Sequence, residues 1–338
     1  MAKRFQRVYI EVGNICNLQC GFCPEVEREK KQMGLELFER ALKQVAPLTE
    51  QVTFHLMGDP LLHPHLPELV DLAEQHNVRV FLVTNGVLLR EKQAELLLSP
   101  AFAQVNFSLH SFADNFPGRD PSDYLEKIFS FTESALQRRP DLYLNYRLWN
   151  LNDPRGSATD NRQMLQRIEQ RFAITAPSDV DIRQKKSFRI RGRLYFHFDT
   201  EFIWPSLDLP VIGQHGRCHG LSSHFGILAD GTVVPCCLDK EGKIPLGNIQ
   251  SQEILDILDS PRAQAILTGF KQRKLVEGLC QRCQYIERFQ PRKASPKLDA
   301  RTSNSEARGR RVETGDQALV PTLASSAPGA APVTATLR

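Results

Sequence analysis

The sequence predicts an α/β fold whose first part is a parallel sheet of βα repeats. Apolar, strand-like runs begin near residues 7, 51, 78, 104, 141 and 179. Helical periodicity lies between them, most clearly over residues 35–45, 66–76, 124–136 and 162–172. This alternation is typical of parallel sheets whose strands are joined by crossover helices. We therefore expect six βα units up to about residue 185.

Length and composition set the limits of this prediction. A chain of 338 residues accommodates such a sheet and a smaller appended module. It has no run of eighteen apolar residues and no signal-peptide core at its N-terminus, so we expect a cytoplasmic protein without a membrane span. In a reducing compartment, its eight cysteines indicate metal ligation more than disulfides.

The first predicted strand leads into a cluster of three cysteines. Residues 8–12 alternate in the manner of a strand, and Cys16, Cys20 and Cys23 follow with CxxxCxxC spacing. Three thiols this close cannot all pair as disulfides. Iron-sulfur clusters are normally held by four thiolates, so a set of three leaves one iron open to a substrate or cofactor.

Three later strand-like runs also carry polar residues at their ends. Residues 52–56 lead into Gly58-Asp59-Pro60, residues 78–83 lead into Thr84-Asn85-Gly86, and residues 105–109 carry Ser108. Each feature alone is an ordinary strand-end turn. Their order and spacing together favour one site at the carboxyl ends of the strands, where barrel enzymes build their active sites.

On these motifs the chain resembles the radical S-adenosylmethionine (radical SAM) superfamily. Phe22 precedes the last cysteine of the loop, the turn at 58–60 is similar to the GEP loop of that family, and residues 84–86 match its TNG corner. Asp59 stands where Glu is commoner. The resemblance implies a partial (β/α)6 TIM-like barrel that stays open on one side.

The resemblance also implies a chemistry and a set of cofactor contacts. Cys16, Cys20 and Cys23 would hold a 4Fe-4S cluster whose fourth iron binds SAM. Reductive cleavage of SAM would give a 5'-deoxyadenosyl radical, which abstracts a hydrogen atom from a substrate. The remaining SAM-binding residues implied by the motifs are Phe22, Gly58, Asp59, Pro60, Asn85 and Ser108.

The other five cysteines lie in the C-terminal third and indicate a second metal site. Residues 225–236 read as a β-hairpin with an Asp-Gly turn, which delivers Cys236 at the end of its second strand. Cys280 and Cys283 form a CxxC after helical stretches at 253–258 and 262–270. With Cys218, these thiols come from distant places in the chain and are able to close one site.

This region resembles the SPASM/twitch domains that carry auxiliary clusters behind radical SAM barrels. The GxxxxC from Gly231 to Cys236 and the closing CxxC match, but Phe289 stands where a further cysteine would fall. The resemblance therefore implies one auxiliary 4Fe-4S cluster. Its ligands would be Cys218, Cys236, Cys280 and Cys283. Structural zinc, which four cysteines also bind, remains the alternative.

Cys237 is left without a partner in this scheme. It is either a small buried hydrophobe, or an alternate ligand or hydrogen-atom donor. His215, His219 and His224 flank Cys218, where lone histidines are usually structural. We expect the loop with Trp204, Pro205 and Pro210 to line the cavity.

The charge distribution marks two further segments. Residues 291–338 hold eight Lys/Arg and four Asp/Glu, so the net charge of +4 lies entirely in this tail, which we expect to be disordered. Residues 183–193 hold six positive charges and no acid. As a linker over an open barrel this stretch is either a solvated loop or a site for a phosphate-bearing or acidic substrate, including RNA.

Together these patterns predict a barrel at 1–185, a linker at 186–215, an auxiliary cluster domain at 216–290 and a tail at 291–338. The favoured function is radical modification of a peptide or protein side chain, with flavodoxin or ferredoxin as reductant. RNA modification or small-molecule cofactor biosynthesis by the same chemistry is the alternative. A non-catalytic iron-sulfur redox sensor or scaffold is the alternative of a different class, although the intact turn at 58–60 argues against it. Oligomeric state is not predicted.

Overall fold

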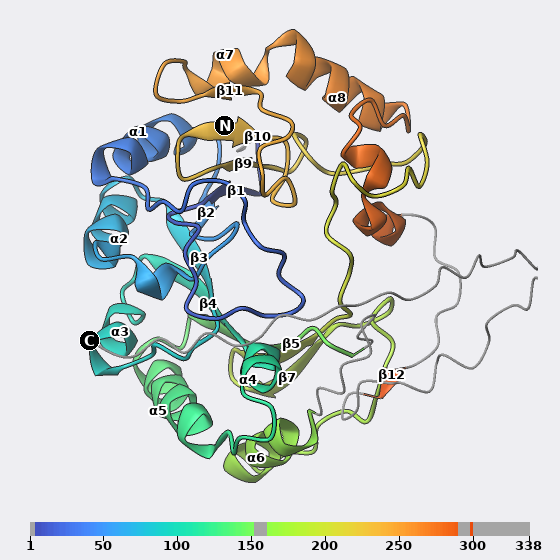
Figure 1. The fold of residues 1–338 in the computed structure, drawn as a ribbon. Helices are drawn as coiled ribbons and strands as arrows, with labels where there is room; N and C mark the ends of the chain where they lie inside the picture. Colours follow the sequence, from blue (N-terminus) through green and yellow to red (C-terminus); the bar gives the residue numbers. More distant parts are fainter. Residues whose placement is uncertain (1–3, 152–160, 290–297, 300–338) are drawn as a thin grey trace, which may run out of the picture. The chain divides into compact units, whose positions relative to one another are not determined.

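One mixed sheet of ten strands organises the part of the chain that the structure describes. The structure is a computed structural model, and it describes residues 4–151, 161–289 and 298–299 (Figure 1). The strand order is β11-β10-β9-β1-β2-β3-β4-β5-β8-β7. All described residues belong to the first of two units, which ends at Ser305.

Six neighbouring strands of this sheet run parallel. They are β1 (Arg7–Ile10), β2 (Gln51–Thr53), β3 (Arg79–Thr84), β4 (Phe102–Ser108), β5 (Tyr143–Leu148) and β8 (Leu194–Phe198). The connecting helices are α1 (Leu35–Val45), α2 (Leu66–Gln75), α3 (Glu91–Leu96), α4 (His110–Asn115), α5 (Ser122–Arg138) and α6 (Arg162–Phe172), with a short 3-10 helix η1 (Pro60–Leu62) after β2. Figure 1 shows α1, α2, α3, α5 and α6 along the outer side of the strands. No pairing among the described strands closes the sheet into a ring, and the expected partial barrel is confirmed.

The predicted position of the sixth strand was wrong. The run near residue 179 forms only β6 (Asp179–Val180), which pairs with β12 (Leu298–Asp299) outside the main sheet. The sixth parallel strand is β8, preceded by its antiparallel partner β7 (Ser187–Arg191). Strand β8 buries every second side chain, namely Leu194, Phe196 and Phe198. Strand β6 buries only that of Val180. The boundary expected at residue 185 therefore precedes the end of the parallel sheet.

The structure also bears on two other expectations, those for the basic stretch and for the C-terminal tail. The basic stretch at 183–193 is largely the edge strand β7, where Arg189 and Arg191 lie over the rings of Tyr195 and Phe172. None of its residues lines the main cavity described below. In the tail expected to be disordered, residues 298–299 pair with β6, and the remainder lies outside the described residues.

The C-terminal module continues the sheet. It contains β9 (His224–Ile227), β10 (Thr232–Val234), β11 (Gly247–Asn248), α7 (Ile254–Leu258), α8 (Pro261–Lys271) and the 3-10 helices η2 (Cys280–Arg282) and η3 (Gln284–Phe289). The predicted hairpin is confirmed, with Gly231 at φ +86° in its turn. β9 pairs parallel with β1 along the whole of that strand. Strand β1 is thereby shared between the barrel and the module.

The outer face of the sheet is apolar and its inner face is polar. Val8 and Ile10 of β1 have no exposed surface, and α1 packs on this layer with an apolar stripe at helical spacing. On the inner face, Gln104 and Asn145 donate to Asn106 Oδ1 at 2.9 and 2.8 Å. Among the described residues, no helix is long and apolar enough to cross a membrane.

The seam between β1 and β9 predicts a strong effect of one core substitution. Phe225 is fully buried on β9, and its ring meets that of Phe5 edge-on at a centroid distance of 4.9 Å. Phe225→Ala is expected to lower the free energy of unfolding by about 3 to 5 kcal/mol, measured by chemical denaturation. Leu255→Ala, at a side chain that is 51% exposed, is the control and should change it by less than about 0.5 kcal/mol. Equal effects of the two variants would contradict this account of the seam.

Candidate functional site

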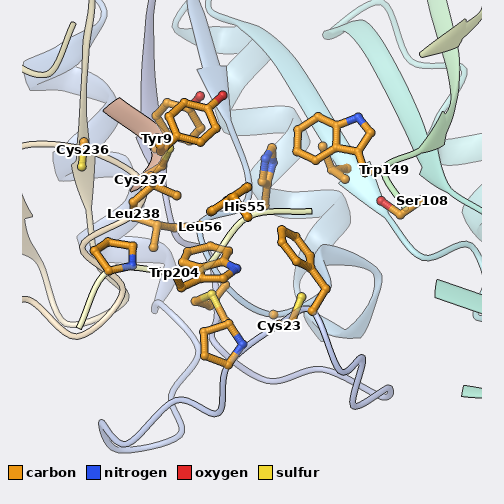
Figure 2. A pocket seen from close by; sticks show the side chains of 18 of the residues that line it. Tyr9, Cys23, His55, Leu56, Ser108, Trp149, Trp204, Cys236, Cys237 and Leu238 are labelled. Carbon is orange, nitrogen blue, oxygen red and sulfur yellow. The ribbon is translucent and has the colours of Figure 1, made fainter. Parts of the chain in front are cut away.

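A single cavity of about 1280 Å³ brings together the residues that the sequence singled out. It is bounded by the inner face of the strands, the cysteine loop after β1 and the C-terminal module. All eight cysteines and both tryptophans of the chain line it. Figure 2 shows Cys237 beside Tyr9 on one side and Trp149 with Ser108 on the other. The two predicted metal sites therefore face one space.

The cysteine loop is closed at its base by backbone and amide contacts. Gly13 forms an antiparallel bridge with Gln32, and Met33 N donates to Val12 O at 2.8 Å. The side chain of Asn14 accepts from Lys31 N at 2.7 Å and donates to Glu29 O at 2.8 Å. The loop thus leaves and rejoins the barrel at one place, and its cysteines lie on the intervening turn.

A buried ion pair joins this loop to the barrel and to the C-terminal module. Arg28 Nη2 donates to both carboxylate oxygens of Glu11 at 2.9 and 3.0 Å, and Ala229 N donates to Glu11 at 3.0 Å. Burial raises the pKa of Glu11, and Arg28 opposes that rise. Glu241 accepts from the backbone N–H groups of Glu27 and Arg28 at 3.1 Å each. Sequence reasoning did not find these residues.

Two of the three thiols after β1, Cys16 and Cys20, have amide hydrogen-bond donors aimed at them. Asn115 Nδ2 lies 3.2 Å from Cys20 Sγ, and Asn85 Nδ2 lies 3.8 Å from Cys16 Sγ. The hydrogen bond that Cys23 donates lowers the pKa of Cys20 to about 7 and raises the pKa of Cys23, while burial raises the pKa of Cys16. Donors of this kind stabilise a thiolate, which is the form that ligates metals. The arrangement therefore fits a cluster held by these three sulfurs.

Helix α4 supplies loop contacts that the sequence reasoning also missed. Asp114 accepts from Gly21 N at 2.7 Å, and Asn115 Oδ1 accepts from Gln19 N at 2.9 Å. Both residues lie in the last turn of α4, the helix that follows β4. The sequence offers no local signal for these contacts, because Asp114 and Asn115 lie 93 and 96 residues from their partners.

The turn at 58–60 lies against the base of the cysteine loop. Gly58 adopts φ +75°, and a Cβ built there would lie 2.4 Å from Gly13 O. Asp59 N donates to Ile15 O at 3.0 Å. Only glycine accommodates both the left-handed backbone and the close approach. Pro60 begins η1 beside it.

The Asp59 carboxylate is engaged within the protein. It accepts from Thr84 Oγ1 at 2.9 and 3.0 Å, from Asn85 N at 2.8 Å and from Leu61 N at 3.0 Å. Burial raises its pKa, and these donors oppose the rise. Asp59 thus joins the two turns that the sequence assigned to SAM. Its expected contact with the SAM ammonium stays a prediction.

The other expected cofactor residues also reach the cavity. Ser108 and Asn85 line it from the ends of β4 and β3. Phe22 packs edge-on against Phe202 at a centroid distance of 5.0 Å, and Phe202 packs against Tyr285 at 5.0 Å. Of the loop expected to line the cavity, Trp204 and Pro205 do so and Pro210 does not.

The thiols of the second group are half-buried and lie close enough to influence one another's pKa. Burial raises the pKa of Cys236, and neighbouring thiols including Cys218 and Cys280 raise it further. Burial raises the pKa of Cys283 to about 11, with Cys218 again contributing. Among the described residues, no group of three or more His, Cys, Asp or Glu side chains is arranged to hold a single metal ion. Four cysteine thiolates are the usual ligands of a 4Fe-4S cluster, so this donor set fits one.

Cys237 lies beside these ligands and faces the cavity. Burial raises its pKa to about 11, and a hydrogen bond with Tyr9 opposes the rise. His219 packs on Phe289 at 4.9 Å, and His224 packs on Tyr9 at 5.7 Å. These histidines make aromatic packing contacts.

Two known protein families match the segments that form this site. Residues 10–145 match the family described as the radical SAM superfamily, and residues 218–284 match the SPASM iron-sulfur cluster-binding domain. The chain therefore contains a radical SAM domain followed by a SPASM domain. The two matches contain all the cysteines of the two thiol groups, including Cys237.

Radical SAM relatives with different substrates are similar to this chain. The GTP 3',8-cyclase of Chlorobaculum tepidum is 33% identical over 202 residues, 58% of this chain and 56% of its own length. The PqqA peptide cyclase of Gluconobacter oxydans is 33% identical over 107 residues, 31% of this chain and 30% of its own length. The chain thus spans little more than half the length of the first relative and less of the second.

A solved structure extends the likeness in fold. The crystal structure of BtrN in complex with AdoMet and 2-DOIA superimposes with a TM-score of 0.54 at 19% identity. The superposition covers 84% of this chain and 94% of BtrN. At this identity the likeness concerns the radical SAM fold.

The close approach at Gly58 yields a test of how the radical SAM loop is supported. Gly118 has the same φ of +75°, but a Cβ placed there would have no atom within 4 Å, so Gly118→Ala measures the backbone strain alone. That strain is about 1 to 2 kcal/mol. Gly58→Ala adds a clash with the backbone and is expected to lose most of the iron bound by the N-terminal thiols, measured as iron per chain after reconstitution. Iron retention in both variants would contradict this role.

Proposed function

We propose that the chain is a radical SAM enzyme that abstracts a hydrogen atom from a peptide or protein side chain. The observation that carries the proposal is the shared cavity, onto which both thiol groups and the polar inner face of the sheet open. A redox sensor or scaffold would have no use for a large substrate space between its metal sites. The cavity therefore favours the catalytic alternative.

The chain's own residues have distinct tasks in this proposal. Cys16, Cys20 and Cys23 hold the first 4Fe-4S cluster, and Gly58, Asp59, Pro60, Asn85, Ser108 and Phe22 surround SAM. Bound together, cluster and SAM supply the 5'-deoxyadenosyl radical, with an electron from flavodoxin or ferredoxin. Cys218, Cys236, Cys280 and Cys283 hold the auxiliary cluster, and Phe22, Phe202 and Trp204 limit the access of water.

An apolar strap beside the cavity supports a peptide substrate. We use this name for residues 202–212, which have no regular structure and whose Phe202 and Trp204 line the cavity. Four of its side chains are exposed large hydrophobics, an arrangement that suits contact with another chain. They are Ile203, Leu207, Val211 and Ile212. The likeness to a peptide cyclase points the same way.

A small-molecule substrate is the second candidate. The inner face of the sheet presents amide, imidazole and guanidinium groups to the cavity, which suits a polar compound. The GTP cyclase likeness and the BtrN superposition agree with this candidate. RNA has less support, because the basic stretch at 183–193 does not line the cavity.

The decisive experiment is anaerobic cleavage of SAM. The chain, reconstituted with iron and sulfide and then reduced, is expected to convert SAM to 5'-deoxyadenosine, measured by chromatography. Cys20→Ala should abolish the product, because the buried ligand that Asn115 contacts is removed. A fully loaded parent protein that forms no 5'-deoxyadenosine would refute the enzymatic proposal.

Iron counting tests the second site. Two cubanes give about eight irons per chain, and Cys280→Ala with Cys283→Ala should lower this to about four. Cys237→Ser is the matched control in the same buried group and should keep about eight. About four irons and one zinc in the parent protein would replace the auxiliary cluster with a structural zinc site.

A further inference from the structure

Arg147 places a positive charge in the cavity without a carboxylate partner. It extends from β5 and lines the cavity, and its guanidinium carbon lies 3.5 Å from the ring centroid of Trp149. Its Nε is fully covered and has no hydrogen-bond partner. Within residues 4–151 and 161–289, no salt bridge involves this side chain. Stacking on Trp149 holds the guanidinium plane but does not neutralise its charge.

The nearby acids are already engaged by other groups. Asp199 interacts with Arg147 through its charge, but its carboxylate accepts from Lys186 Nζ at 2.7 Å and from Arg288 Nη1 at 2.7 Å. Asp59, also on the cavity wall, is taken up by Thr84 and its neighbours. Among the described residues, no carboxylate forms an ion pair with Arg147, and Asp199 shares its charge with Lys186 and Arg288.

Neighbouring residues hold this charge in a defined orientation. Trp149 Nε1 donates to His197 Nδ1 at 2.8 Å, so the proton of the neutral imidazole lies on Nε2. Burial and then the charge of Arg147 lower the pKa of His197 to about 4, which keeps it neutral at physiological pH. The indole that stacks on Arg147 is thus fixed by an uncharged partner, and Arg147 carries the positive charge of this group.

Burying a cation without a counterion costs free energy, and this cost is recovered when an anion enters. Burial lowers the pKa of Arg147 to about 10, so the guanidinium still carries its charge at neutral pH. The planar fork of arginine pairs with carboxylate or phosphate through two parallel hydrogen bonds. Both anions satisfy the same donors.

We propose that Arg147 binds an anionic group of the substrate, a carboxylate or a phosphate, and fixes its position in the cavity. The proposal rests on the proposed function in taking this cavity as the substrate site. It narrows the substrate class to compounds or peptides with an oxyanion near the abstracted hydrogen. SAM also carries a carboxylate, and Arg147 is the register partner of Ser108, so the test includes SAM.

The first measurement needs neither clusters nor substrate. Trp204→Phe leaves Trp149 as the only tryptophan, and its fluorescence is followed in the full chain during titration with inorganic phosphate or with acetate at constant ionic strength. One or both anions should change the emission with saturation. Arg147→Gln in this background should weaken the response about 10- to 100-fold, the loss of a charged hydrogen bond. A response to phosphate alone assigns a phosphate group, and a response to acetate alone assigns a carboxylate.

Arg7→Gln is the matched control, because Arg7 lines the same cavity but lies over the ring of Phe81 at 4.5 Å. It should leave anion binding within about twofold. Arg147→Lys, which keeps the charge and loses the fork, should retain part of the binding, and thermal melting verifies that each variant is folded. No saturable response in the parent, or equal losses in the Arg7 and Arg147 variants, would overturn the proposal.

The second measurement separates substrate from cofactor. In the reconstituted enzyme, Arg147→Gln is expected to leave the affinity for SAM unchanged, because the anion that Arg147 binds belongs to the substrate. A tenfold weaker affinity for SAM would reassign the anion to the SAM carboxylate and overturn the proposal. Absence of 5'-deoxyadenosine in the parent would refute the proposed function alone, because the fluorescence result stands independently of it.

Discussion

The parallel pairing of β1 with β9 is the constraint on which the site depends. β1 lies between β2 and β9, so one strand is shared by the barrel and the C-terminal module. The cysteine loop leaves the carboxyl end of that strand, and the hairpin that begins with β9 carries Cys236 just after β10. Both thiol groups are therefore positioned from adjacent strands. A module attached through a flexible linker would not hold the two groups at one cavity.

Two buried carboxylates support this arrangement from within. Glu11 binds Arg28 in the cysteine loop and the backbone of Ala229 in the module, while Asp59 joins the turns after β2 and β3. A buried carboxylate is tolerated only when its oxygens have donors, and both have several. Because the donors come from different segments, each carboxylate specifies how those segments meet. Removing one donor would leave a charge without compensation at the edge of the metal site.

The features that follow from local sequence pattern could be predicted, and those that depend on long-range contacts could not. Helices α1 and α6 follow from apolar spacing alone, and the hairpin follows from its Asp-Gly turn. The sixth strand was misplaced because the polar–apolar alternation of residues 179–182 resembles a strand, and only its neighbours in space decide whether it joins the sheet. Asp114 and Glu241 were missed for a related reason. Their partners lie 93 and 214 residues away, a distance at which a single sequence carries no pairing signal.

Loops and strands contribute different kinds of residue to the cavity. Most of the residues proposed to ligate metal or surround SAM lie on loops, whereas Arg147, Asn145 and His197 lie within strands whose outer faces are buried. Strand positions are rigid because each is paired on both sides, so a side chain there holds a substrate group with little loss of entropy on binding. Loops are able to keep the same ligand set while the strand side chains change. This division lets a common radical chemistry meet different substrates, and in this chain it places the guanidinium of Arg147 on a rigid strand of the proposed substrate site.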